Sequence, residues 1–261
     1  MAISRLKTST ITNGIAKTQS LWNKESYDGI VKSGLLVHLD ATVSASYPGS
    51  GNTWFDISGN SNNFTIQNSV PYTSGASGYF EFTRTSNHHM TNTTFANYNW
   101  TNGFTVGVWH RNPSSPDLTY YRGLITNGLA GVDRTGSWEM RYGRENFYGG
   151  TQNGTALSVY VATPTGSNAA EINGSLGAWA YYVLVYNNTH VTAYKNGYSF
   201  NSRDVAGGIA KTMTSGVTIG LSPGTSESID GRISHVHIYN RPLSKNEVLS
   251  NFNTLKGRHG L

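Results

Sequence analysis

The stretch Gly231–Leu255, GRISHVHIYNRPLSKNEVLSNFNTL, constrains the fold more than any other part of the chain. Its first half is rich in β-branched and aromatic residues, which predicts a strand. Pro242 has no N–H to donate and therefore ends that strand. Ser244 precedes Glu247 at the spacing of a capping box. Apolar side chains then recur on one helical stripe: Val248, Phe252 and Leu255. One short helix after a strand-rich chain predicts that the helix covers a sheet-based core.

The rest of the chain predicts short strands separated by turns. We expect strands at Leu35–Leu39, Tyr79–Thr83, Phe104–His110, Leu124–Thr126, Trp138–Tyr142, Leu157–Ala162 and Val217–Leu221. Asn196-Gly197 lies between two β-prone runs and predicts a hairpin, because both residues tolerate positive φ. Thirty glycines and many Ser, Thr and Asn residues agree with frequent turns. This spacing of strands predicts a sandwich or barrel and not a βαβ fold.

Three segments carry a family resemblance. Gly231–Leu255 ends a strand at "IYNR" and continues with "LS" and a helix, and Trp179–Phe200 is a Trp-led strand followed by "YKNG". Leu35–Asn63 contains "LDA", "YPGSG" and "SGNSN". Taken in chain order, the three segments resemble motifs of laminin G-like domains, and Leu35–Asn63 is similar to the opening of bacterial and phage members. The resemblance implies an all-β, concanavalin A-like jelly-roll sandwich over residues 33–261, with one short C-terminal helix. Because this fold hosts lectins, hydrolases and structural modules, it does not define a function.

Residues 1–32 predict an extended N-terminal arm that orders on a partner. The stretch has no sustained period and is polar, so that it does not predict a core of its own. The alternative is a leader without contacts. "MAISRL" followed by a Ser/Thr-rich stretch and a Trp resembles the leading arms of tailed-phage virion proteins. The predicted anchoring residues are the spaced apolar ones: Ile3, Leu6, Ile11, Ile15, Leu21 and Trp22.

Charge and cysteine content exclude several classes of function. The formal net charge of +5 is scattered along the chain, without the Lys/Arg clusters of a nucleic-acid footprint. The absence of Cys excludes disulfides and thiolate metal sites, and it fits assembly in a reducing cytosol. No stretch approaches 18 consecutive apolar residues, so we expect no transmembrane helix and no membrane insertion.

One loop predicts a Ca²⁺ site. Asp56, Asn60 and Asn62 lie within seven residues of one another and offer the oxygen ligands that hard cations prefer. Laminin G-like domains often hold one Ca²⁺ at a rim, and Asp40 and Asp230 lie at expected strand ends from which they reach a rim. The alternative is that Asp56 forms an Asx turn with Ser58 and holds no metal.

His235 and His237 share one face of the last expected strand, because side chains alternate with a period of two. Such a pair chelates zinc when a third ligand is present. The commoner arrangement is a pair of histidines that faces solvent, and it is the one we favour here.

A glycan site is predicted on the run from Trp138 to Tyr148, which mixes aromatic rings with polar groups. Aromatic rings stack on sugars, while Arg and Asn donate hydrogen bonds. The candidate residues are Trp138, Arg141, Tyr142, Arg144, Asn146 and Tyr148. The alternative is a tyrosine-rich sandwich with ordinary cross-strand pairs and a buried Trp138.

The sequence does not favour catalysis. Glycosidases of the jelly-roll glucanase type place two carboxylates on one strand as Glu-x-Asp-x-x-Glu, and no segment matches that pattern. We therefore interpret the protein as non-enzymatic.

Together these features favour a virion structural protein of a tailed phage, either a capsid decoration or a tail or fibre component. The arm would bind other virion proteins, and the sandwich would lie on the virion exterior with surface glycans as candidate ligands. We expect assembly in the host cytoplasm and many copies or a homo-oligomer. The alternatives are a secreted bacterial carbohydrate-binding module and a glycoside hydrolase.

Overall fold

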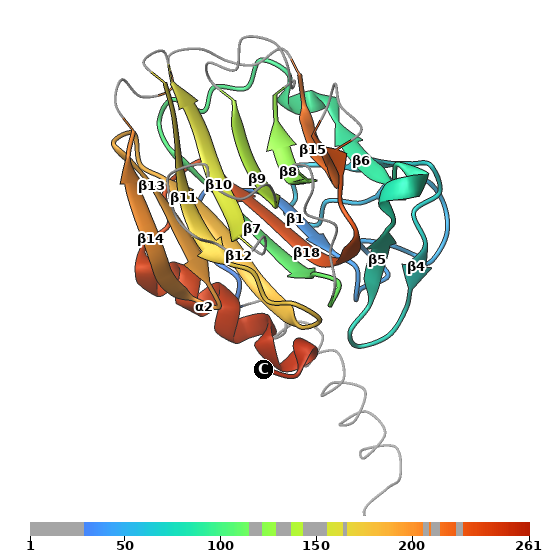
Figure 1. Cartoon of the computed structure of the whole chain (residues 1–261). Helices are drawn as coiled ribbons and strands as arrows, with labels where there is room; N and C mark the ends of the chain where they lie inside the picture. The colour runs from blue at the N-terminus through green and yellow to red at the C-terminus, as the bar shows by residue number, and fades with distance from the viewer. Residues whose placement is uncertain are drawn as a thin grey trace, which may run out of the picture.

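The computed structural model describes residues 29–114, 122–128, 137–142, 156–163, 166–205, 209, 215–222 and 227–261. Within these residues, two eight-stranded antiparallel sheets stack face to face, and one α-helix lies outside the stack (Figure 1). This is the predicted jelly-roll sandwich with a short C-terminal helix. Within the described residues, no helix has the length and apolar content needed to span a membrane.

The first sheet has the strand order β14-β13-β12-β7-β18-β5-β4, and β1 pairs with the far end of β18. Its strands are β1 (Leu35–Asp40), β4 (Tyr72–Thr73), β5 (Tyr79–Phe82), β7 (Phe104–Arg111), β12 (Trp179–Tyr186), β13 (His190–Lys195), β14 (Tyr198–Asp204) and β18 (Gly231–Tyr239).

The second sheet has the order β11-β10-β9-β8-β15-β6-β3-β2. Its strands are β2 (Thr53–Trp54), β3 (Phe64–Gln67), β6 (His89–Asn92), β8 (Arg122–Asn127), β9 (Trp138–Tyr142), β10 (Ala156–Thr163), β11 (Gly166–Asn173) and β15 (Val217–Ile219). A separate pair is formed by β16 (Leu221–Ser222) and β17 (Glu227–Ser228). Short 3₁₀ turns are η1 (Arg84–Ser86), η2 (Thr93–Phe95) and η3 (Lys256–His259).

Alternation along the strands builds the main core between the sheets. In β7, Phe104, Val106 and Val108 point inward, as their period of two predicts. Trp138 and Met140 of β9 face them from the second sheet. The ring centroids of Phe104 and Trp138 lie 5.3 Å apart, so aromatic contacts join the two sheets.

The predicted local signals are confirmed. Asn196 and Gly197 connect β13 to β14 with φ values of 52° and 85°, which are the positive values that the hairpin turn requires. Helix α2 (Lys245–Leu255) begins after Ser244, whose hydroxyl accepts from the Glu247 N–H at 3.3 Å. The Glu247 carboxylate accepts in turn from the Ser244 N–H at 2.8 Å, which completes the capping box.

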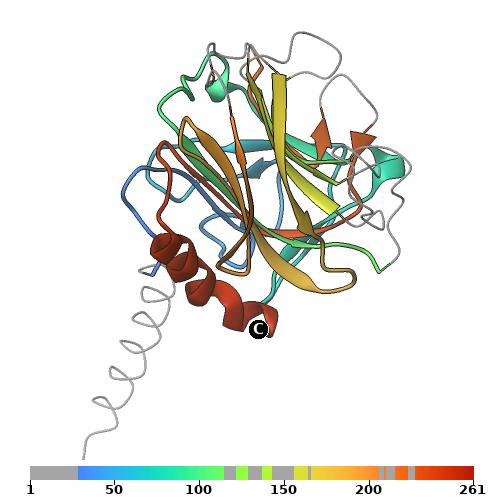
Figure 2. The same cartoon turned by 60° about the vertical axis from the view of Figure 1, so that its left-hand side comes forward.

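Helix α2 covers the outer face of the first sheet and creates a second core (Figures 1 and 2). The ring of Phe252 stacks on Trp109 of β7 with centroids 5.7 Å apart, and both side chains are buried. Ile30, ahead of the predicted boundary at residue 33, is buried in the same core. The central strands of the first sheet are therefore covered on both faces, and this explains why seven of the eight residues of β7 are buried.

Candidate functional site

One row of side chains crosses the first sheet where α2 and η3 no longer cover it. Strand pairing places Trp179 opposite Arg111, Arg111 opposite Arg232, and Arg232 opposite Glu81. Directly paired residues point to the same face of a sheet, so these four side chains stand side by side on the outer face. All four are partly exposed.

Two aromatic rings flank this row. The guanidinium carbon of Arg232 lies 4.5 Å from the ring centroid of Tyr79, which is a cation–π contact. The rings of Tyr79 and Trp179 approach to 6.1 Å, and Trp179 also contacts His259 of η3 at 4.7 Å. The result is an aromatic and charged platform next to the end of the C-terminal segment.

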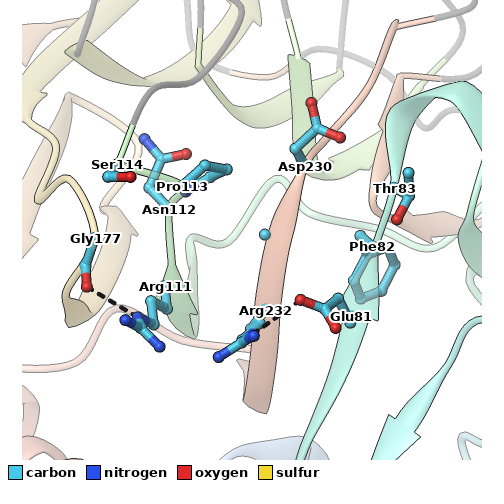
Figure 3. Close-up of a pocket in the computed structure, with 11 residues that line it drawn as sticks. Glu81, Phe82, Thr83, Arg111, Asn112, Pro113, Ser114, Gly177, Asp230 and Arg232 are labelled. Atoms are coloured by element: carbon cyan, nitrogen blue, oxygen red, sulfur yellow. Dashed lines mark hydrogen bonds and ion pairs between the residues drawn. The ribbon is translucent and has the colours of Figure 1, made fainter.

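A groove of about 580 Å³ opens beside the platform, at the ends of β5, β7 and β18. Figure 3 shows Arg111, Arg232 and Glu81 along one side of it, with Asn112 and Asp230 on the other. Its lining is mostly polar and consists of Glu81, Phe82, Thr83, Arg111, Asn112, Pro113, Ser114, Gly177, Asp230, Gly231 and Arg232. This volume lies in the range of small-molecule sites in proteins.

The groove's carboxylates are each paired with an arginine. Arg232 Nε donates to Glu81 Oε1 at 3.0 Å (Figure 3). Asp230 accepts from the backbone N–H of Arg84 at 2.8 Å, and its other oxygen lies 3.8 Å from the Arg84 guanidinium. Charged and polar groups of both kinds therefore face the same space, with donors and acceptors held in fixed positions.

The floor of the groove is formed without a side chain. Gly231 has a φ of +122°, and a Cβ at this position would lie 2.6 Å from the Arg111 carbonyl oxygen. Below the floor, His110 Nδ1 lies 3.0 Å from the Tyr142 hydroxyl. Burial lowers the pKa of His110 to about 3, so the ring is neutral at neutral pH. The site thus rests on a packed interior.

Protein hydrogen-bond donors occupy the carboxylate of the predicted Ca²⁺ loop. The Asp56 carboxylate accepts four hydrogen bonds, from the His38 N–H at 2.8 Å, the Ser58 N–H at 2.9 Å, the Ser58 hydroxyl at 2.7 Å and the Asn62 N–H at 3.0 Å. The Asn60 and Asn62 amides donate to backbone carbonyls, Asn60 to Leu35 and Asn62 to Leu36. Because protein donors occupy the carboxylate, the loop has the geometry of the alternative, an Asx turn.

The expectation of a solvent-facing His235–His237 pair is wrong, because both side chains are completely buried. They point toward the layer beneath α2 and η3, where His38 and His259 join them, and the His38 and His237 rings lie 4.8 Å apart. Among the described residues, no set of three or more acidic or histidine side chains is arranged to hold a metal ion. The alternation along β18 does not reveal that this face is buried, because α2 packs on the face and forms no strand pairing with β18.

An ion-pair network anchors this histidine layer. Asp40 is completely buried and accepts from His235 Nε2 at 3.0 Å and from Arg258 Nη1 at 2.9 Å. Burial opposes its ionisation, but the attraction and hydrogen bond of His235 keep the pKa of Asp40 well below its usual value. Burial lowers the pKa values of His38 and His259 to about 3. At neutral pH the layer therefore contains the ionised Asp40 carboxylate, paired with Arg258, and the uncharged rings of His38 and His259.

The segment predicted to bind glycans provides no exposed platform in its described part. Trp138 and Tyr142 are buried in the main core. Arg141 is also buried, and its guanidinium forms an ion pair of 3.2 Å with Glu139. The other candidates of this segment, Arg144, Asn146 and Tyr148, lie outside the described residues.

The predicted anchoring residues of the arm also lie outside the described residues: Ile3, Leu6, Ile11, Ile15, Leu21 and Trp22. Arm anchoring therefore stays a prediction.

Sequence reasoning missed most of the groove. Asp230 was considered only for a Ca²⁺ site, and the motifs that contain Trp179 and Arg232 were interpreted as signals of the fold. Arg111 lies in no motif. Their juxtaposition depends on the pairing of β12, β7, β18 and β5, which are far apart in sequence. The available signal was weak: Arg111 and Arg232 each lie near the end of a strand whose other residues are almost all buried.

This two-sheet architecture with an open, polar groove on its outer face defines a lectin-like sandwich domain. The model of one family, described as the concanavalin A-like lectin/glucanases superfamily, matches residues 83–249, more than half of the chain. The chain belongs to this superfamily. No curated protein matches it significantly.

Solved structures with the same fold include clostridial toxin binding domains. The binding domain of Paraclostridial mosquitocidal protein 1 has a TM-score of 0.63 and 19% identity, covering 85% of this chain and 52% of that one. The binding domain of botulinum neurotoxin DC, solved in complex with rat synaptotagmin II, has a TM-score of 0.65 and 15% identity, covering 86% and 52%. The same domain in complex with SialylT has a TM-score of 0.62 and 13% identity. The chain spans about half the length of these structures, and at these identities the likeness shows the fold.

Proposed function

We propose that the protein is a non-catalytic glycan-binding module and that the groove bounded by Arg111, Arg232 and Asp230 is its binding site. The observation that carries this proposal is the platform of Tyr79 and Trp179 beside a polar groove. Sugars present apolar faces that stack on aromatic rings and hydroxyls that need donors and acceptors together. The groove offers both within one exposed surface.

The superfamily and the related folds support this proposal. Lectins are among the proteins that name the superfamily, and one toxin binding domain of the same fold was solved in complex with SialylT. That domain was also solved with a protein, rat synaptotagmin II, so a protein ligand is the second candidate. The polar lining and small volume of the groove favour a sugar over a protein surface.

The carboxylates of the groove favour binding over hydrolysis. A glycosidase needs one carboxylic acid that donates a proton to the leaving group. Glu81 already accepts from Arg232 at 3.0 Å, and Asp230 accepts from the Arg84 N–H at 2.8 Å, so both carboxylates are engaged by protein donors. We therefore expect no release of reducing sugar from polysaccharides.

We further propose that the domain is displayed on a tailed-phage virion and that residues 1–32 attach it there. The support is the resemblance of the opening residues to virion arms and of Leu35–Asn63 to phage members of the family. Many copies on one particle would raise the apparent affinity of weak single sites. A secreted bacterial carbohydrate-binding module remains the alternative context.

A glycan array probed with multimerised protein tests the binding site. Trp179→Ala should abolish signals that the wild type gives, because it removes the stacking surface. Tyr198→Ala is the matched control, since Tyr198 is an aromatic residue, 68% exposed, on the distant edge strand β14. Absence of binding in both monomeric and multimeric formats would contradict a glycan-binding function.

Copurification tests the context separately. Protein lacking residues 1–28, which keeps Ile30 in the second core, should melt like the full chain but fail to copurify with virions, and Trp22→Ala should reduce its copy number. If the truncated protein is incorporated at the wild-type level, the arm is not the attachment segment.

A further inference from the structure

The charges that line the groove do not balance one another completely. Glu81 is paired with Arg232, and Asp230 contacts Arg84. Among the residues that the structure describes, Arg111 has no acidic partner. Its Nε donates to the Gly177 carbonyl oxygen at 2.9 Å, which leaves both terminal nitrogens of the guanidinium available to a ligand (Figure 3).

A second donor lies on the next residue of the same strand end. The Asn112 side chain is 3% exposed and lines the groove, and its Nδ2 has no hydrogen-bond partner among the described residues. A buried amide without a partner costs about 1–3 kcal/mol, so such groups commonly mark the place of a missing acceptor. The terminal nitrogens of Arg111 and the Nδ2 of Asn112 therefore present donors to the groove that have no acceptor in the described part of the chain.

Gly177 fixes both donors in place. Its carbonyl accepts from Arg111 Nε, and its N–H donates to the Asn112 carbonyl at 3.0 Å. Held in this way, the end of β7 loses little conformational entropy when a ligand binds. The side chains are preorganised for an acceptor that carries negative charge.

We propose that the groove selects sugars that carry a carboxylate, such as uronic acids, and that Arg111 binds this carboxylate. This inference rests on the glycan-binding function proposed above. A planar guanidinium binds a carboxylate through two parallel hydrogen bonds, and a neutral hydroxyl cannot replace both. The amide of Asn112 donates to the acidic sugar, while Asp230 and Glu81 accept from its hydroxyls.

The test compares two multivalent probes that differ in one group. One carries oligosaccharides that end in glucuronate, and the other carries the same chain ending in glucose. Wild-type protein should bind the glucuronate probe at least about tenfold more tightly, the size expected for hydrogen bonds to a charged group. This preference should weaken with added salt, because the pairing partners are partly exposed.

Variants assign the preference to one residue. Arg111→Gln should remove the preference for glucuronate while leaving residual binding of both probes. Arg203→Gln, at an exposed arginine of β14, is the matched control and should keep the preference. Arg111→Lys retains the charge without the planar fork and should reduce the preference in part; melting curves show whether each variant is folded.

The outcomes separate the two proposals. Equal binding of both probes by wild type, lost in Trp179→Ala, would leave the glycan site and overturn the carboxylate preference. No binding of either probe, or of any sugar on an array, would overturn the proposed function itself. If sodium sulfate displaces the glucuronate probe as well as free glucuronate does, Arg111 is a general anion site and the inference is wrong.

Discussion

Acid should destabilise this protein strongly between about pH 7.5 and about pH 5.5, because three histidines are held uncharged. Burial lowers the pKa of His38, His110 and His259 to about 3 in the folded state. In the unfolded chain a histidine titrates near its ordinary pKa of about 6.5. The unfolded state therefore binds more protons in this range, and the stabilisation present above about pH 6.5 is lost as the pH falls.

The size of the effect follows from the same values. Between about pH 7.5 and about pH 5.5, each such histidine reduces the free energy of unfolding by about 1.4 kcal/mol, since the folded ring takes up almost no protons there. Three rings give a loss of about 4 kcal/mol, a large part of the 5–15 kcal/mol typical of domains. His237, whose pKa burial lowers well below its ordinary value, adds to this loss. Asp40 does not contribute, because its carboxyl group titrates at lower pH in the unfolded chain as well.

Urea denaturation followed by tryptophan fluorescence measures the free energy of unfolding at each pH. His259→Phe provides the decisive variant. The His259 ring stacks on Trp109 with centroids 4.1 Å apart, and neither ring nitrogen has a hydrogen-bond partner among the described residues, so Phe preserves the contact. Over the same pH range, the free energy of unfolding of the variant should fall by about 1.4 kcal/mol less than that of the wild type.

The reasoning is refuted if wild-type stability changes by less than about 1 kcal/mol over that range. It is also refuted if His259→Phe is folded and shows the same pH dependence as wild type.

Three further predictions concern stability. Phe252→Ala should lower the free energy of unfolding by about 3 kcal/mol, because Phe252 fills the second core; an unchanged urea midpoint would show that α2 does not stabilise the sheet. Ser244→Ala should lower the free energy of unfolding by about 1 kcal/mol in the same assay, because α2 loses its N-cap. Ser244→Thr should keep most of this stabilisation, because threonine also caps helices. Asp56→Ala should cost about 2 kcal/mol or more, because backbone N–H groups lose their acceptor. The melting temperature of the wild type should be the same in Ca²⁺ and in chelator. A melting temperature that rises with Ca²⁺ would support the predicted metal site.

Local patterns in the sequence predicted most of the fold. The capping box, the Asn-Gly turn and the alternation in Phe104–His110 each depend on neighbours within a few residues, and each is confirmed. The main error concerned the strand at His235, where alternation assigned a face but not what covers it. Burial there depends on α2 folding back over the sheet, and a strand pattern contains no information on that packing.

The groove could not be predicted from local sequence patterns, for a related physical reason. Its donors and acceptors belong to β5, β7 and β18, and they meet because of strand order and register. The segment at Trp138, which looked like a sugar platform, is instead a core strand of the second sheet. A mixture of aromatic and charged residues describes either case, and only the face that each side chain takes distinguishes them.

The two cores have a consequence for how the native state opens. The layer beneath α2 is closed by a single short helix and the η3 turn, whereas the main core is closed by two whole sheets. The helix can detach at a smaller free-energy cost than global unfolding, so the protein should contain two cooperative units. Amide hydrogens of α2 should exchange with solvent through this partial opening. Those of β7 and β18, bonded on both sides at the centre of the first sheet, should exchange only when the whole sandwich unfolds.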